Sequence, residues 1–288
     1  TDVANQIPDI EIDVRTTASL MENLKLLLDG KVDLTFGYDY HVVLANQGSL
    51  AQAFPDAPPE LLRIKCGAEL VRPAFPDYAQ PARIVVPLYE QQLHIVTTEA
   101  AEITSLIDLK GNRVSIGLPN SVTAELAGYV LDGLDLENDL ALAFLPLDEA
   151  MAALENGQLD AFFWSDRVPN ATIGDWMATS GQGLTMIPVS EAEAAQIMEK
   201  HPGIFHRSKI PVHTYEGLSA DLDSVAVTLV LVTMESFPAE QVSQIISALF
   251  DNSRKIELTV NEAAVFTPQS AIAQLGADTR IYLHSGAA

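Results

Sequence analysis

The amino-acid sequence predicts an α/β fold arranged in two lobes. Apolar runs of strand length alternate with amphipathic runs of helix length along most of the chain, which is typical of sheets with mainly parallel strands. The 288 residues are enough for two compact domains. A helix–glycine–strand pattern also occurs twice, once around Gly30 and once around Gly157.

The predicted strands are short apolar runs, several of them ended by glycine or proline. Residues 7–14 alternate apolar and acidic side chains, which indicates a strand that is buried on one face. The longest run, 225–232, has the length of a core strand and not the roughly 18–20 residues that a membrane span needs. The other strands are expected at 32–37, 61–70, 83–88, 93–98, 113–116, 142–145, 159–163 and 184–188.

The predicted helices carry recognisable signals at their ends. Ser19 and Glu22 have the spacing of a capping box, and Gly30 fits the position just beyond the helix that they begin. Residues 201–218 are rich in proline, glycine and histidine and are expected to be irregular. The other helices are expected at 41–53, 119–130, 148–157, 169–177, 190–200 and 238–250.

The composition is that of a packed globular protein, with 48% hydrophobic and 19% charged residues. The net charge of −23 argues against nucleic-acid binding, because the sequence has no cluster of basic residues that could bind phosphates. Cys66 is the only cysteine, so neither an internal disulfide nor a cysteine-based metal cluster is expected. The chain begins at Thr1, and we expect a processed or trimmed form from which any signal peptide has been lost.

No catalytic or cofactor motif is recognisable in the sequence. A G-x-S-x-G elbow, an H-E-x-x-H pair and a Walker loop are all absent. His201 and His206 lie five residues apart, which is not a standard zinc spacing. We therefore expect no metal, no cofactor and no enzymatic activity.

The repeated pattern predicts two half-structures of similar architecture. Residues 24–40 and 151–167 each contain a helix end, a glycine cap, a strand and a polar strand end. A chance match is the alternative, since helix–glycine–strand is common in α/β folds. Ligands of open α/β sheets bind at the carboxyl ends of the strands. The two polar strand ends are therefore expected to face each other across a cleft.

These strand ends supply candidate ligand-binding side chains. Arg167 is their one basic residue, and its guanidinium could bind a carboxylate through two hydrogen bonds; an ion pair with a neighbouring acid is the alternative. Asp39 and Asp166 could bind an ammonium group or could be solvated turn residues. Aromatic side chains could pack against a ligand's carbon chain or belong to the core. They are Tyr38, Tyr40 and Trp164.

Two predicted helix starts add further candidates. Asn120, Ser121 and Thr123 begin a helix, and free backbone N–H groups at such a position can bind an anion. Helix capping is an alternative that is compatible with binding. Thr17 and Ser19 lie at the start of the first helix, where capping is the simpler interpretation.

Six stretches of the chain, taken in order, carry a resemblance to a known family. They are T-T-A-S-L-M-E-N-L-K-L-L-L-D-G-K-V-D-L, S-L-I-D-L-K-G-N-R-V-S-I-G, D-E-A-M-A-A-L-E-N-G-Q-L-D-A-F-F, K-I-P-V-H-T-Y-E-G, V-A-V-T-L-V-L-V-T and L-H-S-G-A. In this order and spacing they resemble the TAXI-type substrate-binding proteins of tripartite ATP-independent periplasmic (TRAP) transporters. Asn120 and Val122 stand where that family usually has glycines.

The resemblance implies a two-lobed fold of the periplasmic-binding-protein type II kind, with a hinge and an interlobe ligand cleft. One lobe would combine 1–92 with 225–288, and the other would be 93–224. Tyr215, in the T-Y-E-G turn, would lie at the cleft. The implied function is capture of a small organic acid or amino acid, of the dicarboxylate or glutamate-like kind. A periplasmic or extracytoplasmic protein of this type would deliver its ligand to a TRAP membrane permease driven by an ion gradient.

Two other classes of protein remain open at this point. An enzyme on the same two-lobed fold could use Asp39 or Asp166 as a general base, and it should turn over its substrate. A ligand-sensing domain of a receptor should be joined to an output domain, and the sequence shows none.

Overall fold

The structure, a computed structural model, describes residues 10–17, 20–49, 79–119, 121–181, 183–253, 268–273, 275 and 277–287. Helices and strands alternate along these ranges, which confirms the predicted α/β class. The chain forms two compact units and passes between them within strand β2 (Ala82–Thr98) and again within strand β8 (Leu222–Met234). None of the described helices is long and apolar enough to cross a membrane.

The first unit contains the described residues up to 49, 79–90 and those from 227 onward. Its strands are hydrogen-bonded in the order β1-β8-β2, and β1 (Leu34–Tyr38) runs antiparallel to β8. Valines of β2 form a small core with helix α7 (Ala239–Asp251). The other helices are α1 (Leu20–Leu28), α2 (Asp39–Gln47), α9 (Pro268–Ala273), α10 (Ala277–Arg280) and the 3₁₀ turn η5 (Ser285–Ala287).

The second unit contains the described residues from 91 to 226. Its strands follow the order β2-β5-β3-β4, with β6 paired to β2 and β7 paired to β8. β5 runs antiparallel to β2, so that His94 lies opposite Trp164, and parallel to β3. The strands are β3 (Arg113–Ser115), β4 (Ala141–Ala143), β5 (Ala161–Asp166), β6 (Leu184–Met186) and β7 (His206–Ile210).

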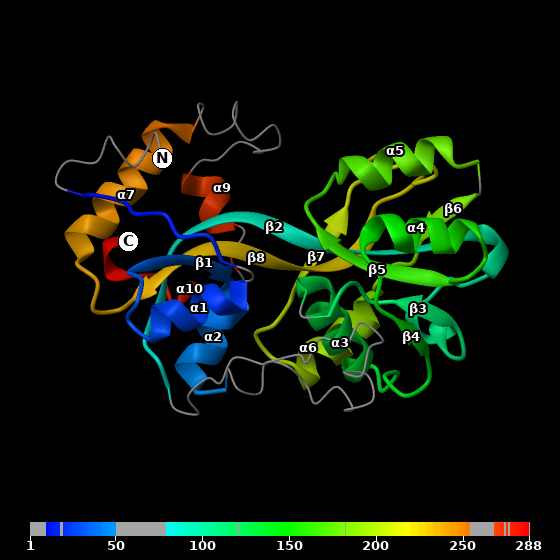
Figure 1. Cartoon of the computed structure of the whole chain (residues 1–288), viewed down its shortest axis with the longest axis horizontal. Helices are drawn as coiled ribbons and strands as arrows, with labels where there is room; N and C mark the ends of the chain where they lie inside the picture. The colour runs from blue at the N-terminus through cyan, green and yellow to red at the C-terminus, as the bar shows by residue number, and fades with distance from the viewer. Residues whose placement is uncertain are drawn as a thin grey trace. The chain divides into compact units, whose positions relative to one another are not determined.

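Helices cover both faces of the sheet in the second unit (Figure 1). Phe162 of β5 lies in a buried apolar cluster with residues of α4 and α5. Ser165 is an odd number of positions further along the strand, so its side chain points to the opposite face. Its backbone N–H donates a hydrogen bond to the hydroxyl of Thr123 in α3. The helices are α3 (Val122–Gly133), α4 (Leu147–Glu155), α5 (Ala171–Thr179), α6 (Glu191–Lys200) and the 3₁₀ turns η3 (Glu99–Ala101) and η4 (Leu106–Leu109).

Several expectations about the strands were wrong. The strands are of mixed direction and not mainly parallel. β2 runs antiparallel to β5 and β6, and β8 runs antiparallel to β1 and β7. Apolar periodicity identifies a strand but contains no information about the direction of its partner. Residues 10–14 form no strand, and β7 lies within the segment expected to be irregular. The strand expected at 61–70 lies outside the described residues.

The repeated helix–glycine–strand pattern has the same local conformation in both copies. Gly30 follows α1 with φ 66°, and Gly157 follows α4 with φ 65°. In each copy the next residue donates a backbone hydrogen bond back into the helix, from Lys31 to Leu26 and from Gln158 to Ala153, both at 2.8 Å. A left-handed glycine that ends a helix in this way was predicted for Gly30.

The crossing of α3 and α6 depends on a glycine in α3. A Cβ atom added at Gly133 would lie 2.9 Å from the Cα of Ile197 in α6, whereas one added at Gly128 would have no neighbour within 4 Å. We expect Gly133→Ala to lower the free energy of unfolding by about 1–3 kcal/mol through overpacking. Gly128→Ala, the matched control in the same helix, should be neutral or stabilising. Urea unfolding of both variants tests this, and equal midpoints would contradict it.

Candidate ligand-binding site

The loop from β3 to α3 turns at Gly117, whose φ of 81° lies in the left-handed region. Ser121 caps α3, since its hydroxyl accepts a hydrogen bond from the backbone N–H of Ala124 at 3.2 Å. The backbone N–H groups of Val122 and Thr123 have no acceptor among the described residues. Free N–H groups at the positive end of a helix attract an anionic group. Asn120 lies outside the described residues.

The side chain of Thr123 connects the start of α3 to the carboxyl end of β5. Its buried hydroxyl oxygen accepts a hydrogen bond from the backbone N–H of Ser165 at 3.1 Å. Ser165 is only 6% exposed, and in the part of the chain that the structure describes its buried hydroxyl has no partner. A buried polar group without a partner is costly, which makes this hydroxyl a candidate donor to a bound molecule.

The turn that follows β5 is held by the side chains of Asp166 and Asn170. One oxygen of the Asp166 carboxylate accepts from the backbone N–H of Arg167 at 2.8 Å, and the other accepts from Asn170 Nδ2 at 2.7 Å. Asn170 Oδ1 in turn caps α5 by accepting from the backbone N–H of Ile173 at 2.8 Å. Both oxygens of the Asp166 carboxylate are therefore bonded within the turn. Arg167, the residue predicted to bind a ligand's carboxylate, lies in the same turn and is half-buried.

Tyr215 and His94 lie behind this turn and are both buried. The hydroxyl of Tyr215 accepts from the backbone N–H of Asn170 at 2.7 Å and lies 2.8 Å from His94 Nε2. His94 Nδ1 lies 3.3 Å from the carbonyl oxygen of Trp164. Desolvation by burial lowers the pKa of His94 to about 4, against smaller raising effects of hydrogen bonds to backbone groups and of Asp166. Burial likewise raises the pKa of Tyr215 to about 12.

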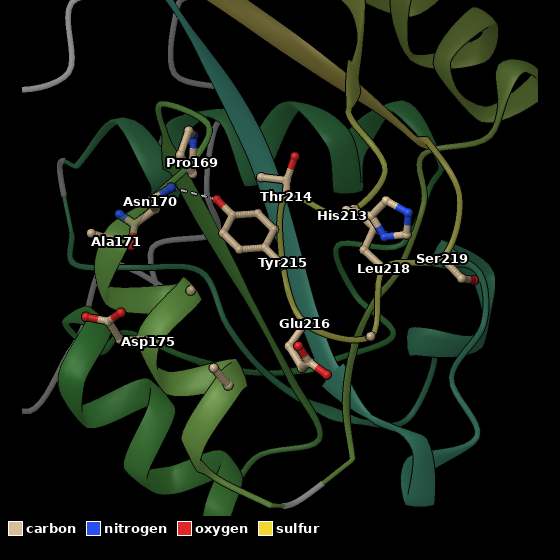
Figure 2. A pocket seen from close by; sticks show the side chains of 13 residues that line it. Pro169, Asn170, Ala171, Asp175, His213, Thr214, Tyr215, Glu216, Leu218 and Ser219 are labelled. Carbon is tan, nitrogen blue, oxygen red and sulfur yellow. Dashed lines mark hydrogen bonds between the residues drawn. The ribbon is translucent and has the colours of Figure 1, made fainter.

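A pocket of about 590 Å³ lies between the start of α5 and the loop 213–219 (Figure 2). Figure 2 shows the ring of Tyr215 in its wall, with the hydroxyl directed at Asn170. Tyr215 is the one predicted binding residue among those that line it. The lining contains the acidic residues Asp175 and Glu216 but no lysine or arginine, so it does not offer the charge that a carboxylate ligand needs.

Three predicted residues of the first unit, Tyr38, Asp39 and Tyr40, lie where β1 continues into α2. The rings of Tyr38 and Tyr40 stack with centroids 5.7 Å apart, and both side chains are buried, which fits the packing alternative. Asp39 is buried too, and its Oδ1 accepts from the backbone N–H groups of Tyr40 and Thr228, each at 3.0 Å. The hydroxyl of Thr17 donates to Asn23 Oδ1 near the start of α1. Ser19 lies outside the described residues.

The structure thus brings one group of predicted residues together at the end of β5. Thr123 contacts Ser165, and a chain of hydrogen bonds links Tyr215 to Asp166 through Asn170. Trp164 packs against the core with its Nε1 buried and without a partner among the described residues. Within the described ranges, no group of three or more potential metal ligands is found.

Sequence reasoning missed three residues of this group. His94 stands inside an apolar strand, and nothing in its sequence neighbourhood distinguishes it from a packed core residue. Ser165 lies in the predicted polar strand end, where the charges of Asp166 and Arg167 are the stronger signal of binding. Asn170 carries a usable signal, because an asparagine after a proline at the start of a helix is a typical cap.

The chain belongs to the NMT1-like family, whose sequence pattern matches residues 76–288. It is also similar to solved structures. The GluR0 ligand-binding core from Nostoc punctiforme in complex with L-glutamate is 16% identical, with a TM-score of 0.42 over 88% of this chain and 81% of that chain. The amino acid ABC transporter substrate-binding protein AbpA from Streptococcus pneumoniae, bound to L-arginine, is 13% identical, with a TM-score of 0.40 over 90% and 78%.

Proposed function

We propose that the chain is an extracytoplasmic solute-binding protein of the TAXI type. It captures a small organic acid or amino acid, of the dicarboxylate or glutamate-like kind, and delivers it unchanged to a TRAP permease. Its architecture is that of the two-lobed periplasmic-binding-protein type II proteins, with lobes 1–92 plus 225–288 and 93–224. The resemblance of the sequence stretches supports this assignment.

One observation in the second unit carries the proposal. The start of α3 presents the free backbone N–H groups of Val122 and Thr123, and the buried hydroxyl of Ser165 lies beside Thr123 without a partner among the described residues. Uncharged N–H and O–H donors at a helix N-terminus suit a carboxylate. Arg167, at the end of the same strand as Ser165, adds a positive charge to a strongly acidic chain.

Trp164, half-buried at the end of β5, is proposed to contact the carbon chain of the ligand. The other proposed ligand contacts are Thr17, Ser19, Asn120, Ser121, Thr123 and Arg167. The buried Tyr38, Asp39, Tyr40 and Tyr215, and Asp166 held within its turn, are proposed to support the site without touching the ligand.

Calorimetric titration with a panel of dicarboxylates, keto acids and amino acids tests the function. We expect binding of one carboxylate-bearing compound in a one-to-one complex, and mass spectrometry should recover it unchanged. Formation of a product would instead identify an enzyme. A panel in which nothing binds would count against a carboxylate-binding protein.

The charge of Arg167 should matter for affinity. We expect Arg167→Ala to weaken binding of the carboxylate ligand about tenfold, because a charged hydrogen-bonded pair is lost. Arg207→Ala is the matched control, since Arg207 is exposed and pairs with Glu191 on the surface. Calorimetry on both variants decides, and an unchanged affinity for Arg167→Ala removes this residue from the site.

A further inference from the structure

A closed ring of hydrogen bonds surrounds the turn after β5. It runs from the carbonyl of Trp164 to His94, from His94 to the Tyr215 hydroxyl, and from that hydroxyl to the backbone of Asn170. The side chain of Asn170 then returns to Asp166 on the strand where the ring began. Three of these four links measure 2.7–2.8 Å, and the fourth measures 3.3 Å.

The proton positions in this ring follow from the chemistry of its members. A carbonyl oxygen can only accept, so His94 Nδ1 must carry a proton to bond with Trp164. In the neutral ring Nε2 is then an acceptor, and the Tyr215 hydroxyl donates to it. The Tyr215 oxygen is free to accept from the Asn170 N–H. The Tyr215 hydroxyl thus donates one hydrogen bond and accepts another, and moving the His94 proton to Nε2 would leave Nδ1 as an acceptor facing the carbonyl oxygen of Trp164.

We propose that His94 and Tyr215 are positioning residues that hold the turn 166–170 in the form in which it presents Arg167 to a ligand. The link to binding rests on the proposed function, whereas the link to the turn does not. His94 lies on β2, Tyr215 on the loop after β7, and Asn170 at the first turn of α5, so the ring fixes the turn from elements on either side.

The ring is suited to this role because both ends of the turn depend on it. The Asn170 N–H has the Tyr215 oxygen as its acceptor, and the Asn170 side chain both caps α5 and holds Asp166. The Tyr215 ring also packs beside α5, since a Cβ atom added at Gly174 would lie 3.7 Å from it. Loss of the hydroxyl alone therefore leaves the packing in place and removes only the polar links.

Amide hydrogen exchange in three variants tests the proposal. Tyr215→Phe keeps the ring and removes the hydroxyl, His94→Leu removes both polar atoms, and His94→Gln keeps an acceptor near the position of Nε2. We expect amides of 167–173 to exchange about tenfold faster in the first two variants, because each loses a buried hydrogen bond. His94→Gln should restore slower exchange. Amides of α4 should be unaffected in all three.

Titration with L-glutamate provides the second readout, with Tyr282→Phe in the other unit as the matched control. If the wild type binds L-glutamate, the first two variants should bind it about tenfold more weakly, and His94→Gln should recover affinity. Wild-type exchange at 167–173 in Tyr215→Phe overturns the proposal, as does faster exchange that extends equally through α4. A wild type that does not bind L-glutamate counts against the proposed ligand class, while the exchange rates still decide whether the ring holds the turn.

Discussion

Replacing Gly117 by alanine is expected to lower the free energy of unfolding by about 3 kcal/mol. The φ of 81° costs an alanine roughly 1–2 kcal/mol in the left-handed region. The added Cβ would also lie 2.8 Å from Thr123 Cβ and 3.1 Å from Ser121 Oγ, which requires a shift worth roughly 1–3 kcal/mol. Since Thr123 bonds to Ser165, this shift should also disturb the proposed site.

Gly111→Ala is the control that separates the two costs. Gly111 has a φ of 80°, but a Cβ atom there would have no neighbour within 4 Å. Gly111→Ala should therefore lower the free energy of unfolding only by the cost of placing an alanine at positive φ, roughly 1–2 kcal/mol. Urea unfolding measures both variants, and calorimetry should show weaker ligand binding for Gly117→Ala alone. Equal losses of stability would mean that Gly117 does not make room for Thr123.

Local features of this fold could be predicted because local chemistry determines them. The left-handed conformation expected at Gly30 is observed, and so is the helix cap expected at Ser121 at the start of α3. Glycine avoids the steric cost of positive φ, and a serine hydroxyl can satisfy a free N–H group wherever the chain begins a helix. These signals depend only on a few neighbouring residues, so they can be recognised in the sequence alone.

Partners that are distant in sequence could not be predicted in this way. His94 and Tyr215 are 121 positions apart, and Thr123 and Ser165 are 42 apart. The type of a residue determines which hydrogen bonds it can form, but it does not determine which residue will lie opposite it in the fold. The direction of β2 and β8 was misjudged for the same reason, because an apolar run is compatible with a parallel or an antiparallel neighbour.

The stability of the protein should fall as the pH is lowered from about 6.5 towards 4, in part because of His94. Its pKa is about 4 in the fold, below its ordinary value of 6.5. Between these values the unfolded chain binds more protons at this residue than the folded one, so stability rises with pH. The contribution is complete above about 6.5 and is lost as the pH falls to about 4. A gap of about 2.5 units corresponds to roughly 3 kcal/mol.

Comparison with His94→Gln isolates this contribution from that of the many carboxylates. Glutamine cannot be protonated in this range but can still accept a hydrogen bond from Tyr215. Asp166, whose charge raises the pKa of His94, and Tyr215 are present in both proteins. Urea unfolding at several pH values between 4 and 7 should therefore show a shallower loss of stability on acidification for the variant. Parallel curves for the two proteins would show that His94 is not held neutral by burial, and the proton arrangement of the ring would have to be abandoned.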